Sequence, residues 1–562
     1  MINRIKLKFG PSPTSEPLEF NLSPITVFVG PNYSGKSKLI RELASLAQHG
    51  RPMSDNVILE DAEFRPYSTE EANAAVEELS LNPYLGEVVQ PEHVIVGRYT
   101  ARNHVPRSAL IEALTQFALS PHESHFRNWA GQWFLNFGVR LLDGQSRIGL
   151  SSDQPFGDLS LAAQSSFQVV FRNDTLRQEI RDIVYKAFGQ YLLFDPTNAG
   201  QLRLRLSMKA PESLEQEQSL TQAAAAFQNQ ATLLGQASDG AKAFCGIMIE
   251  IMAGRPDMLL LDEPEAFLHP ALSYQLGAEV ARQLQGTSKR LFVSTHSSNF
   301  LMGCVSSGTP VNVARLTYRN GVATARHLPN DQLAAIMRNP LLRSAGVLSG
   351  LFFENVVMTE ADTDRSFYQE VNERLLRAND PRGIPNCLFI NANGKDAIPV
   401  IIEPLRKLGI PVAAIYDLDF LKEGGAAATR RLTATGVPLS MQSSVNTARS
   451  SVKLALETAS TNFKKEGGLG VLSGDELIGA QSYLSQLSQF GTFLVPIGEV
   501  EHWLAHLNVT GHASGWLIPM FERMGEDGAA SDYVEPTSGD VWDFLGEIKG
   551  WLQNPSRQGI PN

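Results

Sequence analysis

Short apolar runs alternate with helix-like stretches along the 562-residue chain. Residues 25–29, 258–261, 290–294, 355–359 and 411–416 are each rich in aliphatic or β-branched side chains. Runs of this length, bounded by turn residues, are typical of buried strands. Because helical patterns separate them, the chain is predicted to be an α/β protein with parallel sheets.

The turn-rich and proline-rich stretches suggest how the chain is divided. We expect residues 1–310 to form a first domain that carries a helical insertion at about 106–190. Residues 311–350, which are interrupted by Gly, Ser, Asn and Pro, are expected to form a link that contains helices. Residues 351–562 are expected to form a second domain. Within the first domain, residues 191–194 and 201–207 flank a turn and predict a β-hairpin.

Composition narrows the class of protein. Hydrophobic residues make up 43% and charged residues 19%, as in ordinary globular proteins. No apolar run reaches the roughly 18 residues of a membrane span, so no membrane association is expected. Three scattered cysteines argue against a disulfide framework and indicate a reduced, cytoplasmic location. A net charge of −11 argues against a protein that coats nucleic acid with a generally basic surface. It is compatible with a local basic groove.

Residues 30–37 read GPNYSGKS and match the phosphate-loop pattern G-x-x-x-x-G-K-[ST]. A predicted strand precedes the loop and a predicted helix follows it, so main-chain N–H groups and the helix dipole would bind phosphate. Lys36 is expected to reach the β- and γ-phosphates of ATP, and Ser37 to ligate Mg²⁺. The candidate nucleotide contacts in the loop are Asn32, Ser34, Gly35, Lys36 and Ser37.

Further parts of an ATP site are predicted downstream. The strand at 258–261 runs into Asp262, a candidate Mg²⁺ ligand, and Glu263, a candidate base for the attacking water. His296 ends the next strand, where α/β sheets place ligand-contacting groups, and is a candidate γ-phosphate sensor. Ser238 and Gly240 form a turn before a helix, a second candidate phosphate contact.

Together these motifs resemble the ATP-binding-cassette branch of phosphate-loop ATPases, in its SMC, Rad50 and RecF-like form. The resemblance covers residues 1 to about 310. In that class the signature turn of one subunit covers the ATP of another, so the resemblance implies a homodimer or higher oligomer. The turn at Ser238-Asp239-Gly240 departs from the usual Leu-Ser-Gly-Gly-Gln.

A second group of carboxylates lies beyond residue 350. Glu360 follows the predicted strand at 355–359, and Asp417 and Asp419 follow the one at 411–416. Carboxylates at neighbouring strand ends repel one another unless they are protonated or bridged by cations. Oxygen ligands at this density suit Mg²⁺ or Mn²⁺, which would support phosphodiester cleavage. The alternative is a set of acidic loop caps in a structural domain.

This second group resembles a TOPRIM domain. Glu360 with Asp364 matches its first acidic motif, and Asp417-x-Asp419 its second. An N-terminal ABC-type ATPase joined to a C-terminal TOPRIM domain is the layout of the OLD (overcoming lysogenization defect) family of nucleases. In that family a later acidic residue and a downstream lysine complete the site. The candidates here are Glu501, with Glu499 as its alternative, and Lys549, with Lys395 as its competitor.

The resemblance implies an ATP-binding and ATP-hydrolysing, Mg²⁺-dependent endonuclease that acts on DNA, used in bacterial defence against phage. One alternative is an ATP-driven DNA-binding or repair clamp of the SMC/RecF type with a non-catalytic TOPRIM domain. Another is an RNA- or tRNA-cleaving effector. Relatives of this kind work with a neighbour-encoded helicase, or a reverse transcriptase and its RNA. Residues 421–470 carry scattered basic side chains and form either a DNA-facing insertion or a solvated face.

Overall fold

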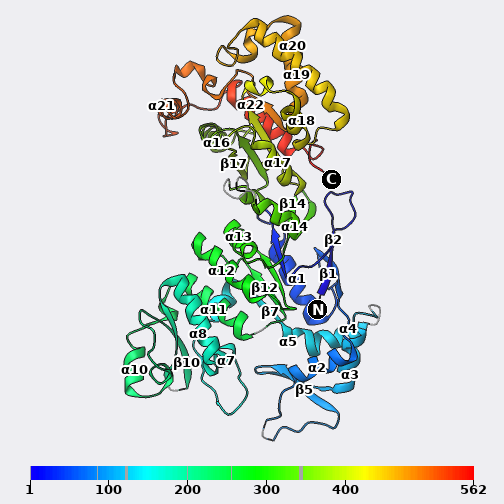
Figure 1. The fold of residues 1–562 in the computed structure, drawn as a ribbon, viewed down its shortest axis with the longest axis vertical. Coiled ribbons are helices and arrows are strands. Elements are labelled where there is room, and N and C mark those ends of the chain that lie inside the picture. The colour runs from blue at the N-terminus through cyan, green and yellow to red at the C-terminus, as the bar shows by residue number, and fades with distance from the viewer. Residues whose placement is uncertain are drawn as a thin grey trace. The chain divides into compact units, whose positions relative to one another are not determined.

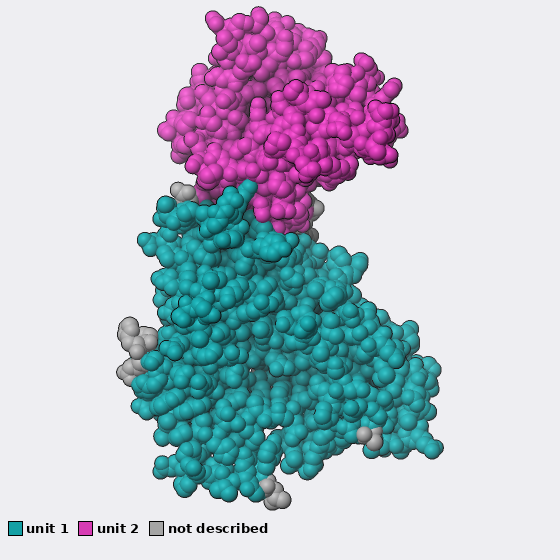
Figure 2. Space-filling model, turned by 180° about the vertical axis from the view of Figure 1, so that it is seen from behind, with its two compact units in different colours: residues 1–333 teal, residues 334–562 magenta. Residues whose placement is uncertain are grey.

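The structure is a computed structural model that describes residues 2–84, 86–120, 124–198, 200–254, 256–338, 340 and 346–561. The chain folds into two compact units, residues 1–333 and 334–562, coloured separately in Figure 2. Each unit has its own hydrophobic core. Among the described residues, no helix combines the length and apolarity needed to cross a membrane.

The main sheet of the first unit has six strands in the order β15-β14-β3-β13-β12-β7. Figure 1 labels β7, β12 and β14 of this sheet. The five strands from β14 to β7 are parallel, and β15 runs antiparallel at one edge. The bounds are β3 Ile25–Val29, β7 Val139–Leu142, β12 Met258–Asp262, β13 Arg290–Ser294, β14 Val311–Arg319 and β15 Val322–Leu328.

Helices pack against this sheet because their apolar faces share its core. Leu39 and Leu43 of α1 (Lys36–His49) lie in one cluster with Phe28, Leu260 and Phe292 of the central strands. The other helices that follow sheet strands or the predicted signature turn are α11 (Asp239–Gly254), α12 (Pro270–Gln283) and α13 (Ser298–Ser306).

Two boundary predictions need correction. Residues 311–328 were expected to belong to the link, but they form β14 and β15, because β14 pairs directly with β3 in the main sheet. The expected helical insertion at 106–190 contains α3 (Arg107–Gln116) and α8 (Asp174–Phe188), but also the sheet strand β7. Of the predicted link helices, α14 (Asn330–Arg338) is present, and residues 339 and 341–345 lie outside the described residues.

Smaller sheets complete the first unit. The hairpin predicted around residues 195–200 is confirmed as β9 (Tyr191–Asn198) and β10 (Gln201–Ser207), which pair antiparallel. Near the N-terminus, β1 (Ile2–Leu7) pairs antiparallel with β2 (Glu19–Asn21) and with β4 (Leu59–Phe64).

The second unit contains a four-stranded, fully parallel sheet in the order β17-β16-β18-β19. Parallel strands end at the same edge, so the residues that follow them meet there. The strands are β16 Asn355–Thr359, β17 Cys387–Asn391, β18 Val412–Tyr416 and β19 Thr492–Leu494. Helices that cover or flank the sheet include α16 (Asp362–Arg377), α17 (Ile398–Lys407) and α22 (Asp540–Gln553).

A helical insertion separates β18 from β19. It consists mainly of α18 (Gly425–Ala434), α19 (Leu439–Ala459) and α20 (Gly474–Ser488), with the short helix η5 (Gly468–Val471) before α20 (Figure 1). This is the region in which the sequence shows scattered basic residues.

Candidate functional site

The phosphate loop connects β3 to α1. Gly30 has φ +141°, and a Cβ there would lie 2.0 Å from the carbonyl oxygen of Leu316, so only glycine fits. The Lys36 ammonium donates to the carbonyl oxygens of Gly30 (3.0 Å) and Pro31 (2.9 Å). Burial lowers the pKa of Lys36 to about 8, against the opposing charges of Glu263 and Asp262. The loop thus holds a buried cation at the start of a helix, as an anion site requires.

The carboxylates predicted to complete this site lie two strands away. Sheet order places β13 between β3 and β12, with Asp262 in register with Ser294 and Ser294 with Phe28. Ser294 donates its hydroxyl to Asp262, and the Glu263 N–H donates to the Ser294 carbonyl at 2.9 Å. Lys36, Asp262 and Glu263 therefore belong to one edge of the sheet.

His296 lies just beyond β13, between the two flanking strands. Its Nε2 is 3.6 Å from Oε1 of Glu263. Burial lowers the pKa of His296 to about 4, and the positive charge of Lys36 adds to this effect. The imidazole is therefore neutral near pH 7 and has one nitrogen that donates and one that accepts. The structure brings Lys36, Glu263 and His296 together as the sequence predicts.

Arg147 belongs to the same site, although the sequence does not point to it. It lies on α6 (Gly144–Gly149), and its guanidinium donates to the carbonyl oxygens of Asp262 (2.7 Å) and Glu263. Its side chain is almost fully buried. Burial lowers the pKa of Arg147, which is opposed by the charges of Glu265, Asp262 and Glu263. Arg147 fixes the main chain that carries both carboxylates, and no local motif marks it.

The Ser238 turn starts α11. Its hydroxyl accepts a hydrogen bond from the Ala241 N–H at 3.3 Å, as a helix cap does. A Cβ on Gly240 would lie 2.5 Å from the carbonyl oxygen of Phe267, in the segment after Glu263. The turn therefore packs on the carboxylate segment of its own chain. Its contact with a nucleotide on a second chain stays a prediction.

In the second unit, the predicted carboxylates follow adjacent strands. Glu360 comes directly after β16 and Asp417 directly after β18, and these strands pair in parallel. The Glu360 carboxylate accepts a hydrogen bond from the Asp417 N–H at 3.3 Å. Asp364, in the first turn of α16, accepts from the Ala361 N–H at 3.2 Å. Asp419 lies two residues beyond Asp417, in the short helix η4 (Leu418–Lys422).

These carboxylates are partly buried and repel one another. Burial raises the pKa of Glu360 to about 8, with further contributions from Asp417 and Asp419. Burial and the charge of Asp417 raise the pKa of Asp364 to about 7. Burial also raises the pKa of Asp417 to about 6, although the neighbouring Lys464 opposes this shift. Such a cluster is stabilised by protons or by bound cations.

Two lysines contact the cluster. Nζ of Lys464 lies 2.9 Å from Oδ2 of Asp417. Nζ of Lys395 lies 3.0 Å from Oδ2 of Asp419 and 2.7 Å from Oε1 of Glu423. Lys395 was predicted from the sequence as the alternative to Lys549. Lys464 was counted only among the scattered basic residues of 421–470, as part of a DNA-facing insertion or a solvated face, and not as a residue of this site.

The prediction of Lys549 needs correction. Its ammonium donates to the carbonyl oxygen of Pro381 and lies near Asp380, whose pKa is lowered mainly by hydrogen bonds from Arg382 and to a smaller extent by the charge of Lys549. The structure therefore does not bring Lys549 to Asp417 or Glu360. The reason is that Lys549 lies on α22 and reaches the loop after α16, not the carboxyl ends of the strands.

Both late glutamates lie near the cluster. The Glu499 carboxylate is 3.3 Å from Nζ of Lys464 and is buried. Glu501 accepts from the Ala513 N–H, lies 2.6 Å from Nδ1 of His512, and its charge raises the pKa values of Asp364 and Asp417. The choice between Glu499 and Glu501 therefore remains open.

The donor set fits a hard divalent cation. All the clustered donors are carboxylate oxygens, the ligands that Mg²⁺ and Mn²⁺ prefer. Oδ1 of Asp419 is buried and has no hydrogen-bond partner within the described part of the chain. Across the described residues, however, no three His, Cys, Asp or Glu side chains already converge as a metal-holding group. Coordination by several of these carboxylates therefore requires them to move closer together.

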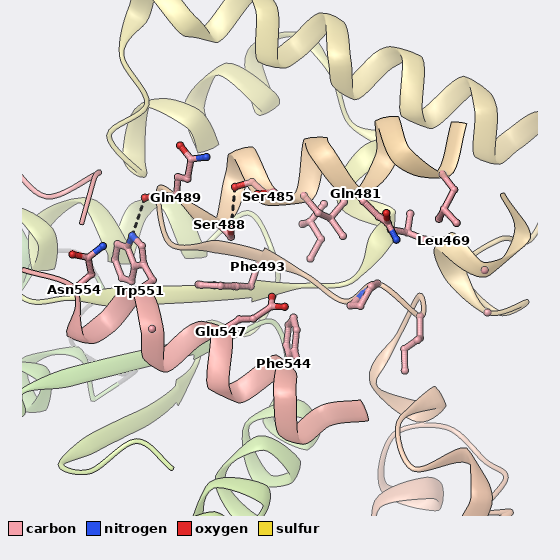
Figure 3. A pocket seen from close by; sticks show the side chains of 18 residues that line it. Leu469, Gln481, Ser485, Ser488, Gln489, Phe493, Phe544, Glu547, Trp551 and Asn554 are labelled. Carbon is pink, nitrogen blue, oxygen red and sulfur yellow. Dashed lines mark hydrogen bonds between the residues drawn. The ribbon is translucent and has the colours of Figure 1, made fainter. Parts of the chain in front are cut away.

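A groove of about 840 Å³ lies elsewhere on the second unit, between α20, β19 and α22 (Figure 3). Its wall includes Phe493, Phe544 and Trp551, with the carboxyl group of Glu547 at the exposed surface. Among the described residues that line it, none is a predicted site residue. The candidate catalytic site of this unit is therefore the group of carboxylates at the strand ends, and not this groove.

Two family models each match one segment of the chain. Residues 193–302 match the model described as an AAA domain, putative AbiEii toxin, Type IV TA system. Residues 351–419 match the model described as an overcoming lysogenization defect protein-like TOPRIM domain. The first match contains Asp262, Glu263 and His296, and the second contains Glu360 and Asp417. The predicted fold class, an ATPase domain followed by a parallel-sheet TOPRIM domain, is confirmed.

Solved structures of SMC heads align with the chain at low identity. An SMC head bound to the C-terminal winged-helix domain of ScpA is 13% identical, with a TM-score of 0.34, covering 59% of this chain and 99% of that one. The SMC head domain from Thermotoga maritima is 13% identical, with a TM-score of 0.28, covering 58% and 98%. The head with an extended coiled coil from Pyrococcus furiosus is 12% identical, with a TM-score of 0.30, covering 60% and 98%. No curated protein sequence matches the chain.

Proposed function

We propose that this chain, an AAA-type ATPase domain joined to an OLD-like TOPRIM domain, is an ATP-regulated, divalent-metal-dependent endonuclease that cleaves DNA. The observation that carries the proposal is the carboxylate cluster at the ends of β16 and β18. Burial and repulsion raise the pKa values of Glu360, Asp364 and Asp417 together. A structural α/β domain has no need for such a group, whereas perturbed carboxylates gathered at strand ends are typical of functional sites.

Glu360, Asp364, Asp417 and Asp419, with Glu499 or Glu501, are the residues that would hold Mg²⁺ or Mn²⁺. A divalent ion bound there would supply water activation and stabilise the leaving oxygen of a phosphodiester. The protein's contribution is to fix the carboxylates at two neighbouring strand ends and to shield them from water. Burial makes their interaction with a cation stronger than it would be at an exposed surface.

In the ATPase unit, Lys36 and the loop residues Asn32, Ser34 and Gly35 would bind the phosphates of ATP. Ser37 and Asp262 would hold its Mg²⁺. Glu263 would accept a proton from the attacking water, and the neutral His296 beside it would contact the γ-phosphate. Arg147 keeps the main chain of Asp262 and Glu263 in place.

Exchange of Asp417 for alanine tests the nuclease assignment. Purified Asp417→Ala protein should lose cleavage of plasmid DNA by about 100-fold or more, because the cluster loses a central ligand. Its ATP hydrolysis should stay within about twofold of the parent, since Lys36 and Glu263 belong to the other unit. Asp475→Ala, which removes an exposed carboxylate of the same unit, is the matched control.

Single-stranded DNA and tRNA should be tested beside plasmid, with Mg²⁺ or Mn²⁺ and with or without ATP. Preferential cleavage of tRNA would favour the RNA-cleaving effector over the DNA endonuclease. If folded Asp417→Ala protein cuts as fast as the parent, the nuclease assignment fails and the ATP-driven DNA clamp becomes the better explanation. The defence role and a neighbour-encoded partner are proposed on the family resemblance.

We also propose that two chains associate through their ATPase domains, with Ser238 and Gly240 of one chain near ATP on the other. Because hydrolysis would dissolve such an assembly, Glu263→Gln protein with ATP is the form to measure by light scattering. A doubled mass that requires ATP is expected. A monomer in every condition would contradict the association.

A further inference from the structure

The helical insertion between β18 and β19 contributes a cation to the carboxylate cluster. Lys464 lies in the loop between α19 and η5, and its ammonium contacts both Asp417 (2.9 Å) and Glu499 (3.3 Å). The side chain is mostly buried, with 23% exposed. Lys464 therefore bridges carboxylates that follow two different strands, β18 and β19.

The backbone around Lys464 is fixed against the loop that leads to Glu499. A Cβ on Gly498, which has φ +108°, would lie 2.0 Å from the carbonyl oxygen of Lys464. Further along, the Leu469 N–H donates to the Pro496 carbonyl at 2.8 Å. Phe463, next to Lys464, is 1% exposed. These contacts fix the main chain at Lys464, so the fold itself positions its side chain beside the carboxylates.

Lys464 and a divalent cation compete for the same oxygen atoms. An ammonium 2.9 Å from Oδ2 of Asp417 occupies a lone pair that a metal ion would need. A metal ion and an ammonium at adjacent positions also repel each other strongly in a partly buried site. The clustered carboxylates do not yet converge as a metal-holding group among the described residues. The ammonium therefore holds Asp417 and Glu499 in an arrangement that a bound divalent cation would have to disturb.

We propose that Lys464 is a displaceable counter-cation of this site: it neutralises Asp417 and Glu499 in the absence of a divalent ion and leaves Asp417 when one binds. The inference rests on the proposed metal-dependent function and adds a group that neutralises these carboxylates before a metal ion binds. The cost of moving the ammonium weakens metal binding, so a higher metal concentration is needed to fill the site.

Titration of Mn²⁺ into EDTA-treated, nucleotide-free, full-length protein tests the displacement. Free Mn²⁺ is measured by electron paramagnetic resonance. Lys464→Gln protein should bind Mn²⁺ about tenfold more tightly than the parent, because one neighbouring positive charge is removed. Lys465→Gln, which makes the same charge change at the next, exposed residue, should stay within about twofold. Unchanged or weaker binding by the Lys464→Gln protein would overturn the proposal.

Thermal unfolding in EDTA tests the counter-cation role without metal. Removing one partner of a buried ion pair leaves the carboxylates uncompensated. The melting temperature of Lys464→Gln protein should therefore fall by several degrees, and that of the Lys465→Gln control by less than about 1 °C. Lys464→Arg keeps the charge and should match the parent in both measurements. An arginine variant that also binds Mn²⁺ about tenfold more tightly would overturn the charge explanation.

Asp417→Ala separates this inference from the proposed function. If the Asp417→Ala and parent proteins bind Mn²⁺ equally, the proposed metal site itself is wrong. If parent binding depends on Asp417 but Lys464→Gln does not strengthen it, the metal site stands and only the counter-cation inference fails.

Discussion

Lys36 in the first unit is buried and Glu360 in the second is partly buried, and loss of water contact moves the pKa of each to about 8 from opposite directions. In each case the fold makes the charged form of the side chain less favourable than in water. A buried ammonium at a helix start is stabilised by an incoming phosphate, and buried carboxylates by an incoming cation. The cost of removing a charged group from water therefore favours binding of an anion at the first site and of a metal cation at the second.

The two regions differ in how their charges are compensated in this structure. Lys36 donates to carbonyl oxygens of its own loop, at Gly30 and Pro31. Asp417 is instead paired with Lys464, which is 47 residues further along the chain (464 − 417). Local compensation leaves a short motif in the sequence, whereas distant compensation does not. Lys36 is thus held by main-chain oxygens inside its own motif, whereas Asp417 is held by a lysine outside any motif.

Lys36→Ala should have the largest effect, and it should impair only the ATP site of the first unit. Loss of the cation that meets the β- and γ-phosphates should weaken ATP binding by about 100-fold or more. Mn²⁺ binding at the carboxylate cluster should not change. Calorimetric titration with ATP provides the measurement, and Lys38→Ala, an exposed lysine two residues along the same helix, is the control. Parent-like ATP binding by the Lys36→Ala protein would contradict the site.

Glu263→Gln should separate nucleotide binding from chemistry. The amide keeps the shape of the side chain but cannot accept the proton, so hydrolysis should slow by about 100-fold. ATP affinity should remain within a few-fold of the parent, because Lys36 and the loop are intact. Phosphate release and ATP titration test this together. Hydrolysis at the parent rate would show that another residue activates the water.

Arg147→Met should have a smaller effect on the same reaction. The change leaves Asp262 and Glu263 intact but removes the donor to their carbonyl oxygens, so the carboxylates lose their fixed position. We expect hydrolysis to fall by about tenfold, since misplacement costs less than loss of the base. Arg147→Lys should recover part of the rate by keeping a donor. A purely structural role would instead lower the melting temperature and leave the rate of the folded protein unchanged.

The smallest effect concerns pH and has opposite signs in the two regions. The folded-state pKa of His296 lies at about 4, below its ordinary 6.5, so unfolded chains bind more protons between these values. Stability from this group is therefore present above about pH 6.5 and is lost as pH falls towards 4. The raised pKa of Glu360 acts the other way. The metal-free second unit should lose stability as pH rises from 4.5 towards 8.

Melting temperatures measured in EDTA from pH 4 to 8 provide the check. His296→Gln should reduce the loss of stability on the acid side, and Glu360→Gln should reduce the loss towards pH 8. His506→Gln, at an exposed position in the second unit, should change neither slope. Identical pH profiles for the parent and Glu360→Gln proteins would show that the Glu360 carboxyl group is not buried as described.

Much of the architecture could be predicted because the signals are local. The apolar runs that became β3, β12, β13, β16 and β18 were all recognised, as was the hairpin of β9 and β10. β7 was missed, because its four residues, Val139–Leu142, carry a short signal beside strongly helical neighbours. The assignment of 311–328 to a link also failed, since the composition of an edge hairpin does not reveal which sheet it joins.

The site residues divide in the same way. Lys36, Asp262, Glu263, Glu360 and Asp417 follow recognisable strands, and the parallel order of those strands brings them together. Arg147 and Lys464 have no motif, and the structure shows that each contacts the carboxylate segments. Lys549 was chosen from its place late in the chain, and its helix directs it to Pro381 instead.

The phosphate loop and the two acidic strand ends owe their chemistry to neighbours within one strand and turn, so they and the two-domain order can be read from the amino-acid sequence. Which distant cations lie against those carboxylates depends on the folded chain, because a long side chain from an insertion leaves no periodic pattern. Burial, and with it each shifted pKa, is likewise a property of the assembled fold. It depends on which segments exclude water from the site, and those segments come from all along the chain.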